Sequence, residues 1–380
     1  MTRRERTLIG LLVVVVLIAI LALIRSQPWG RIDIRLIKPN TKDWIACIRL
    51  NQEGKGDLLV IKPDGSLLPL TDDAHDDQSP DWSPDGTKLV FASNRREEVY
   101  QLWTIDPDGK NLSQLTIGGG AKQAPRYDPD GRHILHIAQG LVTDIDSKGV
   151  HARQLIPLPH QMEQVREQYD QVAFRYAQRV VEDFIAAVQI IDEGEQAVLQ
   201  DLEMGERLFA PPVLLKGERV DIDWAHQGLQ LVVAGVAAEQ AISENEVRQV
   251  GVLGLFDFTE NRKEPRVIPL WVSLDNSEGA IEPAWSPDGS RIAFVMCERR
   301  SNGQLVRKGL MVIPSDGGSP TEIIAGEVYT PDWSPDGQRL VFAMGKPGAR
   351  QIYTIKLDGT DLKPLTTSGD HISPRWSPKQ

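Results

Sequence analysis

The stretch that decides the fold is Trp333-Ser334-Pro335-Asp336-Gly337, followed by the apolar run Leu340-Val341-Phe342, because copies of it recur along the chain. The copies begin at Trp82, Tyr127, Trp224, Trp285 and Trp376, and those at Tyr127 and Trp224 are degraded. Most copies are forty to fifty residues apart, a spacing that is typical of β-propeller blades. The repeat therefore predicts an all-β propeller.

Each copy has the physical signature of a β-hairpin. In Ser-Pro-Asp-Gly, proline presets φ, aspartate tolerates the next turn position and glycine accepts a positive φ. The tryptophan before the turn is a wide apolar plate suited to the seam between two blades. The residues expected to shape the repeats are Trp82, Asp85, Gly86, Trp224, Trp285, Asp288, Gly289, Trp333, Asp336, Gly337 and Trp376.

The two ends of the repeat region complement each other. The segment 44–48 resembles the second strand of a blade but has no Trp-Ser-Pro before it, and the segment 371–378 is a first strand with no second strand after it. Pairing these halves in one blade closes a ring and removes its free edges. Six opening strands then predict a six-bladed propeller over residues 43–378, closed by its N- and C-terminal strands.

One interval between copies is too long for a single blade. From Tyr127 to Trp224 there are 97 residues, and apolar residues between Met162 and Ile191 recur every three or four positions, which favours a helix. We therefore predict a helical insertion at 158–210, between blades 3 and 4, as a docking arm or as packing against the propeller. A seventh blade hidden between Pro157 and Gly217 is the alternative.

The N-terminal segment is strongly apolar. Residues 8–24 contain no charge and are flanked by arginines, and at about 1.5 Å per residue they reach the short end of a membrane span. We predict a cytoplasmic tail (1–7), an uncleaved signal anchor (8–24) and a linker (25–42), with the propeller on the extracytoplasmic side of the cell membrane. A cleaved signal peptide is the alternative, although no small-residue cleavage site follows the apolar run.

The repeats resemble those of a known family. The pattern Pro-x-Trp-Ser-Pro-Asp-Gly, then Leu or Ile and Phe, a strand, Asp-Gly and Leu-Thr is similar to the TolB-type, WD40-like repeat, and also to propeller domains of dipeptidyl-peptidase-like and tricorn-like proteases. It covers residues 43 to about 156 and 220–378. The resemblance implies a ring whose funnel mouth binds a protein or peptide. TolB itself is soluble and periplasmic, so the anchor departs from it.

No catalytic motif is apparent in the sequence. It contains no nucleophile elbow, zincin motif, Walker loop or dinucleotide fingerprint, which leads us to expect no catalytic residue, no metal ligand and no cofactor. Loops that enter the opening strands carry acidic residues and two histidines, and these are the candidate binding residues of a funnel rim. They are His75, Asp76, Asp77, Glu278, Glu282, Glu327, Asp370 and His371. Oxygen ligands from several blades would suit Ca²⁺ if a cation binds there.

Composition limits the partners. The net charge of −11 and the absence of a basic stripe exclude a nucleic-acid partner. Cys47 and Cys297 fall in blades that are not consecutive in the chain, which predicts two buried thiols rather than a disulfide. We therefore expect a membrane-tethered, non-catalytic scaffold that binds a protein or peptide at the channel mouth or on the helical insertion. The alternatives are a metal-dependent hydrolase or lyase with an acidic site in the funnel, and a ligand-binding sensor.

Overall fold

The computed structural model describes residues 40–156, 173–181, 184–191, 194–201, 207–208, 216–225, 229–243, 246–260, 265–273 and 277–378. Every regular element in these ranges is a β-strand. In the same ranges, no helix is long and apolar enough to cross a membrane. The predicted tail and anchor, and the linker up to residue 39, lie outside the described residues.

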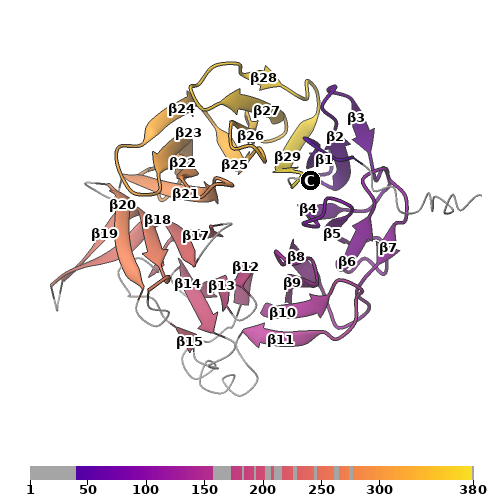
Figure 1. The fold of residues 1–380 in the computed structure, drawn as a ribbon, viewed down its shortest axis with the longest axis horizontal. Coiled ribbons are helices and arrows are strands. Elements are labelled where there is room, and N and C mark those ends of the chain that lie inside the picture. Colours follow the sequence, from indigo (N-terminus) through magenta and orange to yellow (C-terminus); the bar gives the residue numbers. More distant parts are fainter. Residues whose placement is uncertain are drawn as a thin grey trace, which may run out of the picture. The chain divides into compact units, whose positions relative to one another are not determined.

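The strands form seven sheets that follow one another around a central channel (Figure 1). We number these blades in chain order. Blade 1 contains β29 (Asp370–Trp376), β1 (Ile45–Leu50), β2 (Gly56–Ile61) and β3 (Leu67–Pro69). Blade 2 contains β4 (Asp77–Trp82), β5 (Leu89–Ser93), β6 (Gln101–Ile105) and β7 (Ser113–Gln114). Blade 3 contains β8 (Lys122–Tyr127), β9 (His133–Ala138), β10 (Leu141–Asp146) and β11 (Arg153–Ile156).

The remaining four blades complete the ring. Blade 4 contains β12 (Ala173–Val181), β13 (Phe184–Ile191), β14 (Gly194–Asp201) and β15 (Arg207–Leu208), with β16 (Lys216–Gly217) also paired to β14. Blade 5 contains β17 (Arg219–Trp224), β18 (Gln230–Ser243), β19 (Glu246–Asp257) and β20 (Arg266–Val272). Blade 6 contains β21 (Glu278–Trp285), β22 (Arg291–Arg299), β23 (Leu305–Pro314) and β24 (Thr321–Ala325). Blade 7 contains β25 (Val328–Trp333), β26 (Arg339–Met344), β27 (Gln351–Lys356) and β28 (Lys363–Pro364).

The ring closes in blade 1, as the two half-repeats predict. Strand β29 pairs antiparallel with β1, with Trp376 opposite Ile45 and Asp370 opposite Leu50. The innermost strand of this blade therefore comes from the end of the repeat region and the other three from its beginning. The first strand of every blade faces the channel (Figure 1).

The predictions of six blades and of a helical insertion are wrong. Residues 173–181, 184–191 and 194–201 form three antiparallel strands of blade 4, and Ile191 at the end of β13 pairs with Gly194 at the start of β14. A step of four residues fits one face of a helix, but it also fits one face of a strand, whose period is two. Consecutive residues 185–189 are all buried, as in a strand covered on both faces, whereas a helix at this spacing would expose one side. The rest of the predicted insertion at 158–210, including residues 158–172, lies outside the described residues.

The core lies between successive sheets. One apolar cluster joins Ile48 and Val60 of blade 1 to Trp82 and Phe91 of blade 2, and others repeat this arrangement further round the ring. Phe91 and its counterparts are fully buried, and each contributes about 2 kcal/mol by leaving water. The two cysteines are buried free thiols, which confirms the expectation from the sequence.

The Ser-Pro-Asp-Gly turns are closed by short local hydrogen bonds. In blade 2 the Ser83 hydroxyl donates to Asp85 Oδ1 at 2.8 Å, and the Lys88 amide donates to Ser83 Oγ at 2.9 Å. The glycine at the turn exit, Gly86, has a φ of 64°, where a Cβ would be strained. The same bonds recur in blades 6 and 7, and in blade 6 they lower the pKa of Asp288 to about 2, mainly through the Ser286 hydroxyl.

His136 on β9 of blade 3 is a buried histidine, and its burial makes the stability of the protein depend on pH. Burial is the main cause that lowers its pKa to about 4, while the unfolded chain takes up the proton near 6.5. Its neutral form therefore contributes stability that is lost as the pH falls from 6.5 to 4, by about 3 kcal/mol in total. The corresponding residue in blade 2 is Phe91, so we expect His136→Phe to flatten the dependence of the urea midpoint on pH in this window. The exposed His151→Ala serves as the control and should keep the wild-type dependence.

Candidate functional site

The channel opens into a pocket at the end where the Trp-Ser-Pro turns lie. It encloses about 800 Å³ and is lined by residues from the innermost strands of all seven blades. Prolines of the turns, Pro84, Pro129, Pro287 and Pro335, form part of its wall. The wall is strongly charged, with four arginines and five carboxylates among its lining residues. The pocket is therefore a candidate site for a polar ligand.

A repeated backbone kink shapes this wall. In five blades the innermost strand contains a residue with positive φ directly before a proline, three positions before the aromatic residue of the repeat. These residues are Ser79 (54°), Ala124 (49°), Glu282 (52°), Thr330 (45°) and Ser373 (53°). The strand register shifts at the same point, as between Gln78 and Asp81 of β4, which marks a β-bulge. Non-glycine residues adopt such a φ at a cost of about 1 kcal/mol each, so the repeated kink is a feature of the ring.

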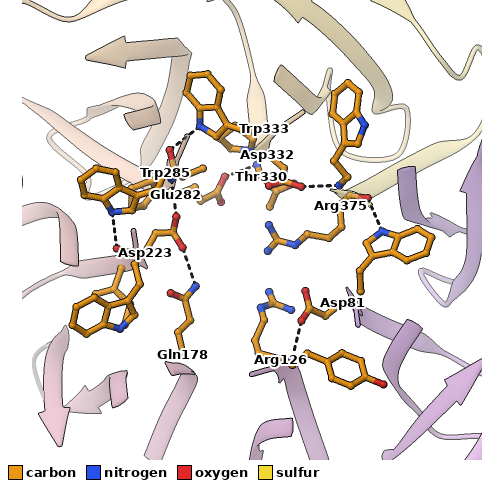
Figure 2. A pocket seen from close by; sticks show the side chains of 18 of the residues that line it. Asp81, Arg126, Gln178, Asp223, Glu282, Trp285, Thr330, Asp332, Trp333 and Arg375 are labelled. Atoms are coloured by element: carbon orange, nitrogen blue, oxygen red, sulfur yellow. Dashed lines mark hydrogen bonds between the residues drawn. The ribbon is translucent and has the colours of Figure 1, made fainter. Parts of the chain in front are cut away.

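The residue directly before the aromatic residue of the repeat connects neighbouring blades. Asp81, Asp223 and Asp332 each accept a hydrogen bond from a backbone N–H of the following blade, at 2.7–2.8 Å. In the opposite direction, tryptophan Nε1 donates to the backbone oxygen of the preceding blade, as from Trp82 to Arg375 at 3.1 Å. Figure 2 shows these bonds around the channel. The repeat tryptophans therefore lie between neighbouring blades, and their hydrogen bonds connect the strands that line the pocket.

One half of the wall is a continuous chain of ion pairs. Arg175 Nη2 lies 2.8 Å from Asp221 Oδ1, and Arg219 bridges Asp221 at 3.0 Å and Glu282 at 3.1 Å. Glu282 also forms an ion pair with Arg307 at 2.6 Å. The Arg307 guanidinium lies 4.1 Å from the centre of the Tyr329 ring. Burial alone would raise the pKa of Asp221, but Arg219 and Arg175 outweigh it and the pKa is lowered.

The other half of the wall has a different charge pattern. Arg126 of blade 3 and Arg375 of blade 1 extend into the channel near Asp81, which belongs to blade 2, the blade between them (Figure 2). Burial raises the pKa of Asp81 even though both arginines and the Tyr127 N–H act in the opposite direction. Its carboxyl group therefore exchanges a proton at a higher pH than an ordinary aspartate. Two guanidinium groups so placed favour an anion between them.

The residues expected on an acidic rim have several locations. Of the eight, Glu282 lines the pocket. Asp77 and Asp370 are buried and ion-paired, with Arg95 at 2.7 Å and Arg350 at 2.6 Å, and Arg350 lowers the pKa of Asp370. Asp76 is also buried, and its carboxylate accepts a hydrogen bond from the Gly56 N–H at 2.7 Å. His75 contacts Asp73, and His371 is buried. Glu278 is exposed and Glu327 is half-buried.

Most of the charged residues that line the pocket were not among the site residues predicted from the sequence. Asp81, Arg126, Asp332 and Arg375 all occupy the same place in the repeat, between a proline and an aromatic residue. In a strand that lines a channel, this position faces the lumen. The pattern Pro-x-Trp or Pro-x-Tyr could therefore have identified these lining residues. Its middle residue changes from blade to blade, while the proline and the aromatic ring are kept.

Comparisons with known proteins agree with the fold. Residues 271–380 match the family described as "TolB beta propeller domain". The structure of TolB from Acinetobacter baumannii superposes with a TM-score of 0.52 at 15% identity, covering 90% of this chain and 68% of that one. At this identity the likeness concerns the fold alone.

Two curated relatives have names that denote peptidases. The uncharacterised peptidase YuxL of Bacillus subtilis (strain 168) is 34% identical over 71 residues, which is 19% of this chain and 11% of that protein. Dipeptidyl-peptidase 5 of Porphyromonas endodontalis is 23% identical over 289 residues, which is 69% of this chain and 36% of the relative. The chain thus spans about a third or less of their length.

These relatives correct the expectation that the chain is not an enzyme. The expectation rested on missing motifs, whereas the similar proteins include peptidases, so an absence of catalysis is not supported. Motif searches detect local nucleophile and cofactor patterns, and they do not detect groups that converge from separate blades. The recurring Trp-Ser-Pro turns and the closed ring of sheets show that the described part of this chain is a β-propeller, and its residues 271–380 are similar to the TolB propeller family.

Proposed function

We propose that this propeller binds a peptide segment of a protein partner in its channel pocket, with an acidic group of the peptide held between Arg126 and Arg375. The observation that supports this most is that the two guanidinium groups, from the blades next to that of Asp81, extend into the channel near each other (Figure 2). Guanidinium groups bind carboxylates through short, charge-assisted hydrogen bonds. The ligand group is therefore a carboxylate, from a peptide C-terminus or an acidic side chain.

The size and wall of the pocket support a peptide. Ligand pockets typically enclose about 300–1,000 Å³, and this one lies within that range. The proline rings of the turns offer apolar contacts, while Thr330 and Gln178 offer hydrogen-bonding groups. The names of the two curated relatives denote proteins that act on peptides, which favours the same ligand class here.

The proposal extends to the place where the propeller works. The apolar run at residues 8–24 supports a membrane anchor, and the arginines before it favour an N-terminus in the cytoplasm. The likeness to TolB-type propellers supports a location outside the cytoplasm. We therefore propose a tethered propeller that meets its protein partner on the extracytoplasmic side.

The arginine pair provides the direct test. A library of random hexapeptides with free carboxyl termini is panned on the wild-type protein, and the affinity of enriched peptides is measured by calorimetry. We expect Arg126→Ala and Arg375→Ala each to weaken binding about tenfold to a hundredfold, because each removes a charge-assisted hydrogen bond. Arg132→Ala, on an exposed turn of the same blade, should leave binding unchanged. Failure to enrich any peptide, or equal affinities for the arginine variants and the wild type, would contradict the proposal.

The same assay gives a pH dependence through Asp81. Above its raised pKa the Asp81 carboxylate competes with the ligand for the two arginines, so Asp81→Asn should strengthen binding, by about tenfold. Asparagine keeps an oxygen that can accept the Tyr127 N–H. As the pH falls through the pKa of Asp81, the wild type loses this competing charge, and its affinity should approach that of Asp81→Asn. An advantage of the variant that persists at low pH would show that the charge of Asp81 is not responsible.

A further inference from the structure

Blade 3 contains a cluster of metal-ligand residues outside the channel site. It consists of Asp128, in the turn after β8, His133, at the start of β9, and Asp144, on β10. One ligand atom from each residue lies within 4.8 Å of the other two. We propose that this cluster, hereafter the blade 3 triad, binds a first-row divalent transition-metal cation.

The triad occurs where the repeat does not require such residues. The position of Asp128 is a serine in blades 2, 6 and 7: Ser83, Ser286 and Ser334. The position of His133 is Lys88, Arg291 and Arg339, and that of Asp144 is Thr104, Val312 and Thr354. Those three blades fold with a hydroxyl, a cation and an uncharged side chain there. The fold therefore does not explain why all three positions of blade 3 change together to ligand types.

Burial makes the charge of the triad significant. The exposed fraction is 3% for Asp128 and 1% for Asp144. The cations beside them include Arg153, whose Nε lies 3.1 Å from Asp144 and whose side chain is 58% exposed, and His133, whose Nδ1 lies 3.9 Å from Asp128. Two carboxylates held close together in a low-dielectric site repel each other, and a bound divalent cation compensates both. His133 is half-buried, which leaves a path for the ion and for water.

The ligand set indicates the kind of ion. Two carboxylate oxygens and one imidazole nitrogen suit Zn²⁺ and its neighbours in the first row, whereas Ca²⁺ and Mg²⁺ prefer oxygen alone. Ligand atoms around a tetrahedral Zn²⁺ are about 3.3 Å apart. Shifts of about 1 Å in these side chains would bring the three ligand atoms from within 4.8 Å of one another to that separation. Water would fill the remaining position. Because Pro129, next to Asp128, lines the channel pocket, the ion would also fix the turn that borders it.

Repeat-matched substitutions test the triad without guessing at tolerated residues. Asp128→Ser, His133→Lys and Asp144→Thr give blade 3 the residues that blade 2 has at these positions, singly and together. The protein is stripped with a chelator, and Zn²⁺ and Co²⁺ binding is followed by calorimetry, by Co²⁺ absorption and by the melting temperature. His151→Ala, which removes an exposed histidine of the same blade, is the control for adventitious surface binding.

We expect the wild type and His151→Ala to bind one equivalent of Zn²⁺ and to melt at a higher temperature with it than without it. Each single triad variant should lose more than about tenfold in affinity, and the triple variant should show no saturable binding and no metal-dependent melting shift. Circular dichroism of the stripped proteins verifies that the variants are folded. No saturable binding by the wild type, or wild-type affinity in a folded His133→Lys variant, would overturn the proposal.

Discussion

Ending the chain after Gly369 will abolish the cooperative unfolding of the propeller. The missing strand, β29, supplies five registered pairs to β1 and is the innermost strand of blade 1. Its removal also takes away the Asp370 partner of Arg350 and the carbonyl that accepts the Trp82 indole N–H. The expected loss is more than about 5 kcal/mol, which is comparable to the whole stability of a typical domain.

The measurement is urea unfolding followed by tryptophan fluorescence and circular dichroism. A chain that ends at Pro378 keeps the complete strand and serves as the control, with an unchanged midpoint expected. In the truncated chain we expect a broad, non-coincident transition, because opening the ring exposes the edge of β1 and the seams beside it. A sharp transition at the control midpoint would show that ring closure is unimportant for stability.

Replacing Glu282 with alanine is expected to cost about 3–5 kcal/mol. Its carboxylate accepts from Arg219 at 3.1 Å, from Arg307 at 2.6 and 2.9 Å, and from the Thr330 N–H at 2.7 Å. Its side chain is only 15% exposed, so water can replace these contacts only in part. The variant would leave two arginine side chains in the channel wall without this shared partner.

The matched control for this variant lies on the same strand. Glu278 is exposed at the start of β21, and Glu278→Ala should change the free energy of unfolding by less than about 0.5 kcal/mol. Glu282→Gln keeps the shape and one acceptor oxygen but loses the charge, so an intermediate loss is expected. Equal stabilities of Glu282→Ala and Glu278→Ala in urea unfolding would mean that the ion-pair chain does not stabilise the ring.

The part of the fold that could be predicted consists of local structure and of its repetition. Ser83, Asp85 and Gly86 form their turn through hydrogen bonds between residues at most five positions apart. The turn can therefore be predicted wherever these residue types recur. Closure through β29 and β1 followed from two incomplete repeats at opposite ends of the repeat region. Blade 4 could not be read in this way, because its strands lack the Trp-Ser-Pro turn and its apolar spacing fits both a strand and a helix.

The sequence by itself determined the all-β propeller, the turn chemistry, the closing strand and the burial of both cysteines, because each depends on neighbours in the chain or on the repeat. Only the tertiary structure decided that there are seven blades and which charges meet in the channel. Asp81 and Arg375 are 294 positions apart in the sequence, and the ring alone brings them together. The physical reason is that a pocket wall built from seven strands takes one or a few side chains from each, so no local stretch contains the site.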